Sequence, residues 1–193
     1  WMSTPEAEVV SLRGPDRQLP YAAEAEVSVL GAMLIDPDAV AKAVEIIDDS
    51  MFYREGHRRI YRSMTRLFQR GEVVDPTTVA EELKKTDEIE QAGGLPYLAE
   101  LLDAVATAAN IEYHARIVRE RALMRRLIGA SSEIIQDVYQ PGERTVEELL
   151  DQAEHRIFQV AQSHDREGFV WLKKILYPTF ERIEQLQAAQ GGI

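Results

Sequence analysis

The chain has 193 residues, of which 45% are hydrophobic and 28% charged, a composition typical of a globular protein that can bury a core. It contains no cysteine and no run of about 18 apolar residues, which excludes disulfides, cysteine-ligated zinc and a membrane span, and favours the cytoplasm. The 22 Lys and Arg against 33 Asp and Glu give a net charge of −11, which disfavours a general surface for nucleic-acid phosphate.

The first 18 residues show no sustained apolar period, and we expect them to form a flexible arm. Trp1 precedes Met2, so Trp1 is interpreted as a residue left by expression of the protein. The folded part is expected to begin near Leu19 and Pro20.

Short helices are predicted throughout residues 19–106, which we expect to form a small helical head. One helix spans 22–35 and stops at Asp36-Pro37, a pair that also starts the next helix, with Asp36 as cap and proline at the first position. The pair Asp75-Pro76 repeats this arrangement. After the Gly93-Gly94 turn, Pro96 is expected to open a further helix carrying Leu98 to Val105, and no convincing strand is predicted.

A much longer helix is predicted from Ile111 to about Gln140, capped by Asn110 and about 45 Å long. Pro141-Gly142 ends it, and Thr145 with Glu148 forms a capping-box pattern that starts a second helix. Residues 107–163 therefore predict an antiparallel helical hairpin. Two helices cannot cover their own apolar faces, so we expect the hairpin to pack on the head or on another chain.

A polar linker begins at residue 164 and leads to an amphipathic segment that completes the region 164–193. Its apolar residues recur at helical spacing, although Pro178 bends the helix unless the helix starts there. Such a tethered helix is typical of an element that docks in a partner's groove. The alternative is that the segment folds back on its own hairpin.

The search for catalytic motifs is negative. The histidines show no zinc-binding pair, and His164-Asp165 lacks the downstream aspartate that a metal-dependent phosphohydrolase requires. No glycine is followed by lysine, so there is no phosphate-binding P-loop, and no nucleophile-elbow motif occurs. We therefore assign no catalytic, cofactor-binding or metal-binding residue to this chain.

One charge pattern exceeds the background. Residues 53–70 contain six arginines and one glutamate, and five arginines recur every fourth residue: Arg54, Arg58, Arg62, Arg66 and Arg70. One hypothesis is a basic strip that binds an acidic partner or nucleic-acid phosphate. The favoured alternative is a solvated helix face neutralised by acidic neighbours, because no aromatic residue for base stacking lies on that face.

Four motifs, in order, resemble the N-terminal domain of the DnaB family of bacterial replicative DNA helicases. They are LPYAAEAEVSVLGAMLID from Leu19, FYREGHRRIY from Phe52, AGGLPYLAEL from Ala92 and AANIEYHARIVRERALMRRLI from Ala108. The resemblance covers residues 19–193. It implies an all-α fold in which a small multi-helix head is followed by a long hairpin and a separate C-terminal linker helix, the same boundaries that the caps and periods predict.

The resemblance also implies a function. Heads and hairpins of six subunits would pair into a collar that recruits primase, while helicase loaders act on the linker and motor regions and the complete ring encircles DNA. The ATP- and Mg-dependent motor would follow Gly191-Gly192, so this chain alone is expected neither to hydrolyse ATP nor to unwind DNA, and to bind DNA weakly or not at all. The alternative is a stand-alone all-helical regulatory or scaffold protein that self-associates.

Two sets of apolar residues are the candidates for assembly under this resemblance. Intersubunit docking by the linker helix is assigned to Leu172, Ile175, Leu176, Phe180 and Ile183. A second set is assigned to packing or dimerisation of the hairpin, without distinguishing contacts within one chain from contacts between chains. Its members are Ile117, Met124, Leu127, Ile135, Leu149, Ile157 and Val160.

Overall fold

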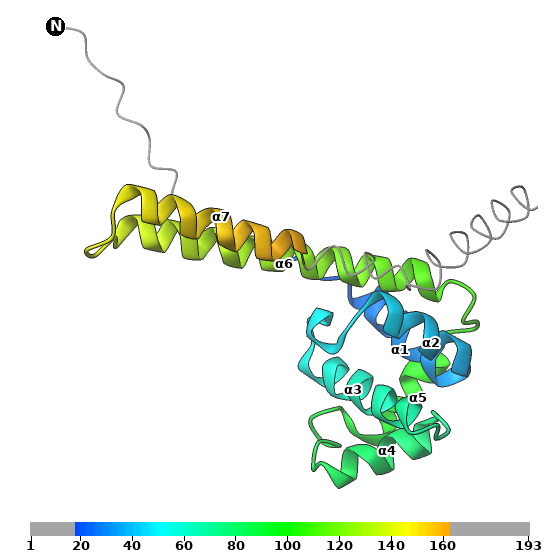
Figure 1. The fold of residues 1–193 in the computed structure, drawn as a ribbon. Helices are drawn as coiled ribbons and strands as arrows, with labels where there is room; N and C mark the ends of the chain where they lie inside the picture. The colour runs from blue at the N-terminus through cyan, green and yellow to red at the C-terminus, as the bar shows by residue number, and fades with distance from the viewer. Residues whose placement is uncertain (1–17, 163–193) are drawn as a thin grey trace, which may run out of the picture.

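A computed structural model describes residues 18–162 of the chain, and every regular element in that range is a helix. The all-α prediction is therefore confirmed for this part. The predicted linker helix, with Leu172, Ile175, Leu176, Phe180 and Ile183, lies outside the described residues. The elements, drawn in Figure 1, are α1 (Ala23–Ile35), α2 (Pro37–Ile46), the 3-10 turn η1 (Asp49–Met51), α3 (Glu55–Gln69), α4 (Pro76–Lys85), α5 (Gly94–Asp103), α6 (Ile111–Tyr139) and α7 (Val146–Gln162).

Local capping chemistry explains the starts of α2, α4 and α7. The Asp36 carboxylate accepts a hydrogen bond from the Asp38 backbone N–H at 2.9 Å, with Pro37 at the first helical position. Asp75 and Thr78 form a reciprocal capping box at the start of α4. These signals lie within four residues of each helix start, which is why the sequence predicts them.

Two helix starts differ from the prediction. Helix α5 begins at Gly94, so Pro96 occupies its third position and Val105 lies beyond its end. Gly93, in the left-handed region at φ 94°, precedes the helix, and Pro96 fits anywhere in a first turn, where backbone N–H groups have no helical acceptor. Asn110 precedes α6 as predicted, but its side chain makes no capping hydrogen bond.

Helix α1 is the centre of the head. Val29, Leu30 and Met33 are fully buried, because α2, α5 and α6 all pack against it. A Cβ at Gly31 would lie 2.3 Å from the Leu101 carbonyl oxygen, so only glycine permits this approach of α1 to α5. Helices α3 and α4 complete the head on the side away from α6 (Figure 1).

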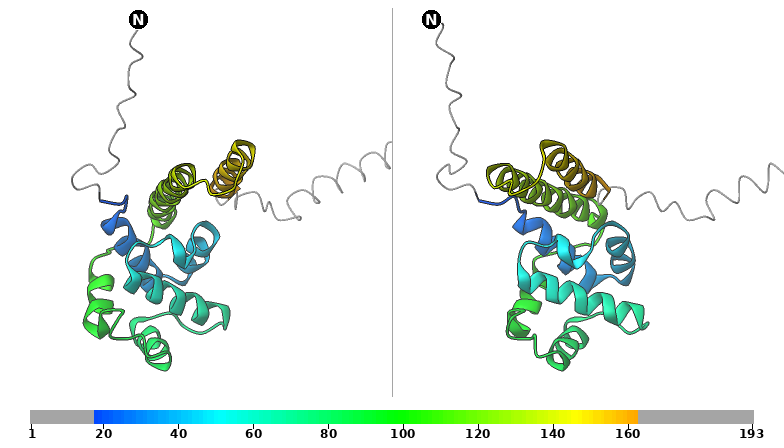
Figure 2. Two further views of the ribbon diagram at one scale, coloured as in Figure 1. Left: turned by 90° about the vertical axis from the view of Figure 1, so that its left-hand side faces the viewer. Right: turned by 60° about the vertical axis from the view of Figure 1, so that its left-hand side comes forward.

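Helix α6 belongs to two parts of the molecule. Its first half lies over the head and buries Ile111, Ala115, Val118 and Ala122 in the core. Its second half extends beyond the head and pairs with α7, as Figures 1 and 2 show. The core of the head therefore continues past residue 106, where the head was predicted to end, into the helix that also builds the hairpin.

Candidate assembly surface on the helical hairpin

Helix α7 packs against α6 but buries none of its own residues. Met124, Leu127 and Val138 of α6 are exposed, and Val146, Leu150 and Ile157 of α7 are between 43% and 68% exposed. Both sets recur at helical spacing, so each helix carries an apolar stripe along the hairpin. Leu150, at 64% exposure, shows how much of this surface the chain alone leaves in water.

The two stripes meet in a groove near the end of α7. The groove has a volume of about 370 Å³ and is lined by Glu120, Leu123, Met124, Leu127, Val160 and Ala161. Glu120 is its one charged residue, and the remaining lining is aliphatic or Met. An apolar groove that continues into exposed stripes can bury the same kind of surface from a partner.

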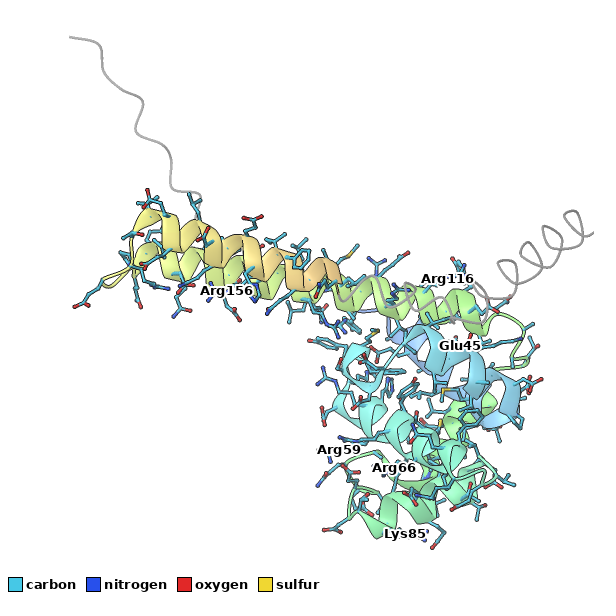
Figure 3. All side chains as sticks on the ribbon, viewed as in Figure 1. Glu45, Arg59, Arg66, Lys85, Arg116 and Arg156 are labelled. Carbon is cyan, nitrogen blue, oxygen red and sulfur yellow. The ribbon has the colours of Figure 1, made fainter. Side chains whose placement is uncertain are left out.

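Another face of the hairpin is polar and holds the two helices together. Arg156 of α7, labelled in Figure 3, pairs with Asp137 and lies 3.2 Å from the Glu133 carboxylate, both on α6. Arg144, in the connecting turn, pairs with Asp137 at 3.0 Å. These two guanidinium groups hold the pKa of Asp137 below its ordinary value.

The start of α7 is the predicted capping box. The Thr145 backbone N–H donates to the Glu148 carboxylate at 2.8 Å, and the Glu148 N–H donates to Thr145 Oγ1 at 3.2 Å. The turn at Pro141-Gly142 and this cap fix the register of α7 on α6, and so the positions of the two stripes.

The seven predicted hairpin residues occupy three environments. Met124, Leu127 and Val160 line the apolar groove, and Ile157 is 43% exposed on α7. Ile135 and Leu149 are half-buried. Ile117 instead packs against the core of the head, because it lies on the first half of α6. The structure thus brings Met124, Leu127 and Val160 together in one groove and places Ile117 on the head.

The arginines of α3 divide into two groups. Arg62, Arg66 and Arg70 pair with carboxylates: Arg62 lies 3.4 Å from Glu88, and Arg66 and Arg70 lie 3.0 and 2.8 Å from Glu82. Figure 3 places Arg59 and Arg66 along α3, with Lys85 on α4. For this group the structure favours the neutralised helix face over a basic strip.

Glu82 is buried beneath these cations, at 5% exposure. Its hydrogen bonds with Arg70 and Arg66 outweigh the effect of burial and lower the pKa of the Glu82 carboxyl to about 2. This ion-pair cluster joins α3 to α4 and explains why the arginines recur on that face.

The first part of the strip has different partners. Arg58 donates from Nε to the Phe52 carbonyl oxygen at 2.7 Å, and Arg54, which precedes α3, forms none of the ion pairs found among residues 18–162. Sequence reasoning missed that Arg125 and Arg126 of α6 reach the same segment. They lie more than 70 residues away along the chain, so no local pattern could have indicated it.

A buried polar network was also missed. Glu26 and His57, each 1% exposed, share a 2.6 Å contact between Oε2 and Nδ1. The other ring nitrogen of His57 lies 2.6 Å from the Tyr97 hydroxyl, and the Tyr53 backbone N–H donates to Glu26 at 2.6 Å. The network links α1, α3 and α5 and satisfies each buried group, which is a structural arrangement.

Within residues 18–162, no group of three or more His, Asp or Glu side chains is placed to hold a metal ion. None of the helices described there is long and apolar enough to cross a membrane.

Comparison with known proteins gives consistent results. The model of the DnaB-like helicase N-terminal domain family matches residues 18–120. The replicative DNA helicase DnaB of Geobacillus stearothermophilus and the replicative DNA helicase DnaC of Bacillus subtilis (strain 168) are each 44% identical over 178 residues, which are 92% of this chain and 39% of those proteins. The replicative DNA helicase DnaB of Mycobacterium leprae is 40% identical, with 92% and 29% covered.

Solved structures show the same fold. The crystal structure of the N-terminal domain of DnaB helicase from Mycobacterium tuberculosis matches with a TM-score of 0.70 and 42% identity, covering 74% of this chain and 99% of that one. A structure of a DnaB-like replicative helicase and its interactions with primase matches in fold, with a TM-score of 0.60 and 24% identity, over 84% of this chain and 35% of that one. The chain thus spans about two fifths of the first two relatives, and matches nearly all of a solved N-terminal domain.

Proposed function

Because the chain belongs to the family of DnaB-like helicase N-terminal domains, we propose that it is the assembly and partner-binding part of a hexameric replicative DNA helicase. The exposed apolar face of the hairpin is the observation that supports this role. Helix α7 has no buried residue of its own, and the groove and stripes beside it are suited to a second copy of the chain. Family membership favours this function over a stand-alone scaffold protein.

The proposal includes partners and activities of the complete helicase. The collar built by these chains recruits primase, a loader acts on the linker and motor regions, and the ring encircles DNA in the cytoplasm. ATP and Mg act in the motor domain, and residues 1–193 alone neither hydrolyse ATP nor unwind DNA. The support for these points is the kinship with replicative helicases.

Self-association through the hairpin is tested by Leu127→Asp combined with Leu150→Asp. The two aspartates place charges on both stripes, so sedimentation of the 193-residue chain is expected to show dimers or larger species for the unchanged protein and monomers for the variant. The matched control is Gln136→Asp with Gln159→Asp, which adds the same charge at exposed positions away from the stripes. A purely monomeric unchanged chain at high micromolar concentration would overturn the proposal.

Docking of the linker helix is tested in the complete helicase. Ile175→Asp with Phe180→Asp is expected to leave the melting transition of the head unchanged and to abolish hexamers, because both residues belong to the apolar stripe predicted for that segment. Hexamers that persist in the variant, measured by native mass, contradict the docking assignment.

A further inference from the structure

A cluster of arginines surrounds residues 50–53, at the point where α6 leaves the head. Arg126 donates to Ser50 Oγ at 2.9 Å, and Arg125 donates to the Met51 carbonyl oxygen at 2.6 Å. Arg58 donates to the Phe52 carbonyl oxygen at 2.7 Å. We call these three residues, with Arg54 beside them in the chain, the joint arginines.

The joint arginines differ from Arg62, Arg66 and Arg70 because the oxygens of residues 50–53 that Arg58, Arg125 and Arg126 contact are neutral. Carbonyl and hydroxyl oxygens satisfy the N–H donors but leave the positive charges uncompensated. Of the four, only Arg58 has a carboxylate partner in the described part of the chain, the exposed Glu55 at 3.4 Å. Burial, together with the charges of Arg58 and Arg126, lowers the pKa of Arg125, although buried Glu26 offsets part of this effect. An anion bound here would gain from this positive field.

Aromatic rings adjoin the cluster. Tyr53 stacks on Tyr21, with ring centroids 4.7 Å apart and planes 20° from parallel, and the Arg125 guanidinium lies 5.5 Å from the centre of the Tyr53 ring. Tyr21 also lines an open hollow of about 570 Å³ beside His114 and Ile117. Arg125 connects these features, since it also donates to the Pro20 carbonyl oxygen at 2.8 Å.

We propose that the head–hairpin joint binds single-stranded nucleic acid, with phosphates on Arg54 and Arg126 and a base stacked beside Tyr21. Guanidinium groups without a carboxylate partner, next to aromatic rings that solvent reaches, are the combination that holds a single strand, because every unpaired base offers a face for stacking. Here Tyr53 is 37% exposed and Tyr21 is half-buried. The site uses only residues of this chain and does not depend on the proposed function. The site is a small positive region on a chain with a net charge of −11, and that net charge opposes the binding of long duplexes.

A single strand fits this surface better than the two other anionic partners. In duplex DNA the base faces are stacked on one another and cannot reach Tyr21. An acidic peptide can pair with the guanidinium groups but gains nothing from the Tyr21–Tyr53 stack. The dependence of binding on Tyr21 therefore separates nucleic acid from an acidic protein segment.

The test uses a fluorescent oligothymidylate of about 25 nucleotides and the 193-residue chain. Fluorescence anisotropy measures binding from low to physiological salt. Two to four phosphate contacts, from Arg54 and Arg126 alone to all four joint arginines, predict that the binding constant falls with salt with a logarithmic slope of about −1.4 to −2.8. Arg54→Gln and Arg126→Gln are each expected to reduce the slope by about 0.7, and Tyr21→Leu to weaken binding about tenfold without changing the slope.

Three controls make the result decisive. Arg121→Gln removes a charge from α6, where the side chain contacts Met124 rather than residues 50–53, and is expected to bind as the unchanged chain does. Arg126→Gln keeps a donor for Ser50, and melting curves verify that each variant is folded. The proposal is overturned if the oligonucleotide does not bind at low salt, if Arg121→Gln weakens binding as much as Arg126→Gln, or if a polyglutamate peptide binds while the oligonucleotide does not.

Discussion

Helices α3 and α4 end with the same pattern of backbone hydrogen bonds, but the residue that adopts the left-handed conformation after each helix differs. After α3, Gly71 lies in the left-handed region at φ 70°, with its N–H bonded to Phe68 O. After α4, Asp87 takes this position at φ 57°, with its N–H bonded to Lys84 O and the Glu88 N–H bonded to Leu83 O. Asp87 is the one residue other than glycine with positive φ in residues 18–162, so α4 ends with a strained residue.

Replacing Asp87 by glycine is expected to stabilise the protein. Asp87→Gly removes the Cβ strain and raises the free energy of unfolding by about 0.5–1 kcal/mol, as measured by urea unfolding. Gly71→Ala is the matched control and is expected to lower it by about 1 kcal/mol, although a Cβ at Gly71 would meet no atom within 4 Å. A destabilised Asp87→Gly variant would contradict this account.

The Glu82 carboxylate makes the head sensitive to acid. Its pKa in the folded protein, about 2, lies below the ordinary value of 4.5, so the unfolded chain takes up the proton first. The stability from this group is fully present above about pH 4.5 and is lost as the pH falls towards 2.

Glu82→Gln is expected to remove this dependence. The free energy of unfolding should fall by about 1–2 kcal/mol at neutral pH, and its slope between pH 4.5 and 2 should be smaller than in the unchanged protein. The measurement is urea unfolding across that pH range. The exposed Glu81, which pairs with Lys84, provides Glu81→Gln as a control with a smaller effect. Equal slopes for the two variants would show that the Glu82 cluster is not responsible.

The sequence predicts the role of a residue well where its hydrogen-bond partner lies only a few residues away along the chain. Asp36, Asp75 and Thr145 act on N–H groups two or three residues away, so each cap can be identified from the sequence. The contact of Arg125 with Pro20 spans 105 residues, and that of His57 with Tyr97 spans 40. Such partners are set by how the helices pack, and a charge pattern along one helix cannot predict them.

At the scale of elements, the hairpin is stabilised by polar contacts on one face and by its cap. Its exposed apolar stripes add little until a partner covers them. In the single chain, the pairing of α7 with α6 therefore depends strongly on Arg156, which reaches both Asp137 and Glu133.

Arg156→Ala is expected to loosen α7 without affecting the head. Asp137 keeps Arg144 as a partner, but the direct ion pairs between the helices are lost, so backbone amides of α7 should exchange hydrogen faster while those of α1 do not change. Hydrogen exchange followed by mass spectrometry measures both. Arg116→Ala, which loses a pair with Glu112 on the same helix, is the control and should leave α7 unchanged. Equal exchange in α7 for both variants contradicts the role given to Arg156.

Helix boundaries were predictable to within about two residues because caps, prolines and apolar periods coincide. The hairpin followed from the turn at Pro141-Gly142 and the length of the helix before it. The sequence could not show that α6 serves the head as well. Ile117 and Leu127 are apolar residues of one continuous helix, and only packing places the first on the head and the second on the groove.

At the scale of the whole molecule, the head needs the first half of α6. Ile111, Ala115, Val118 and Ala122 close a core that would otherwise face water. Exposing them and the surfaces they cover would cost several kcal/mol, comparable with the 5–15 kcal/mol that stabilises a typical domain.

Truncation tests this division. A chain ending at Ile128 is expected to unfold in one cooperative thermal transition and to remain monomeric, because it keeps the core of the head and loses α7. A chain ending at Ala106 is expected to show no cooperative transition, since its core lacks α6. Differential scanning calorimetry with sedimentation measures both properties. Cooperative folding of the shorter chain would mean that the head is complete without α6.

The position of Ala122 has a consequence for how the protein is made. Ala122 is the last buried residue of the core, and Leu123, the next residue, already lines the apolar groove. At 5–20 residues per second, a ribosome needs roughly one to five seconds to proceed from there to the start of α7, whereas small helical domains fold within milliseconds. The order of synthesis therefore lets each head fold before the apolar surface of its hairpin is complete. Nascent chains then meet with folded heads rather than as partly folded intermediates.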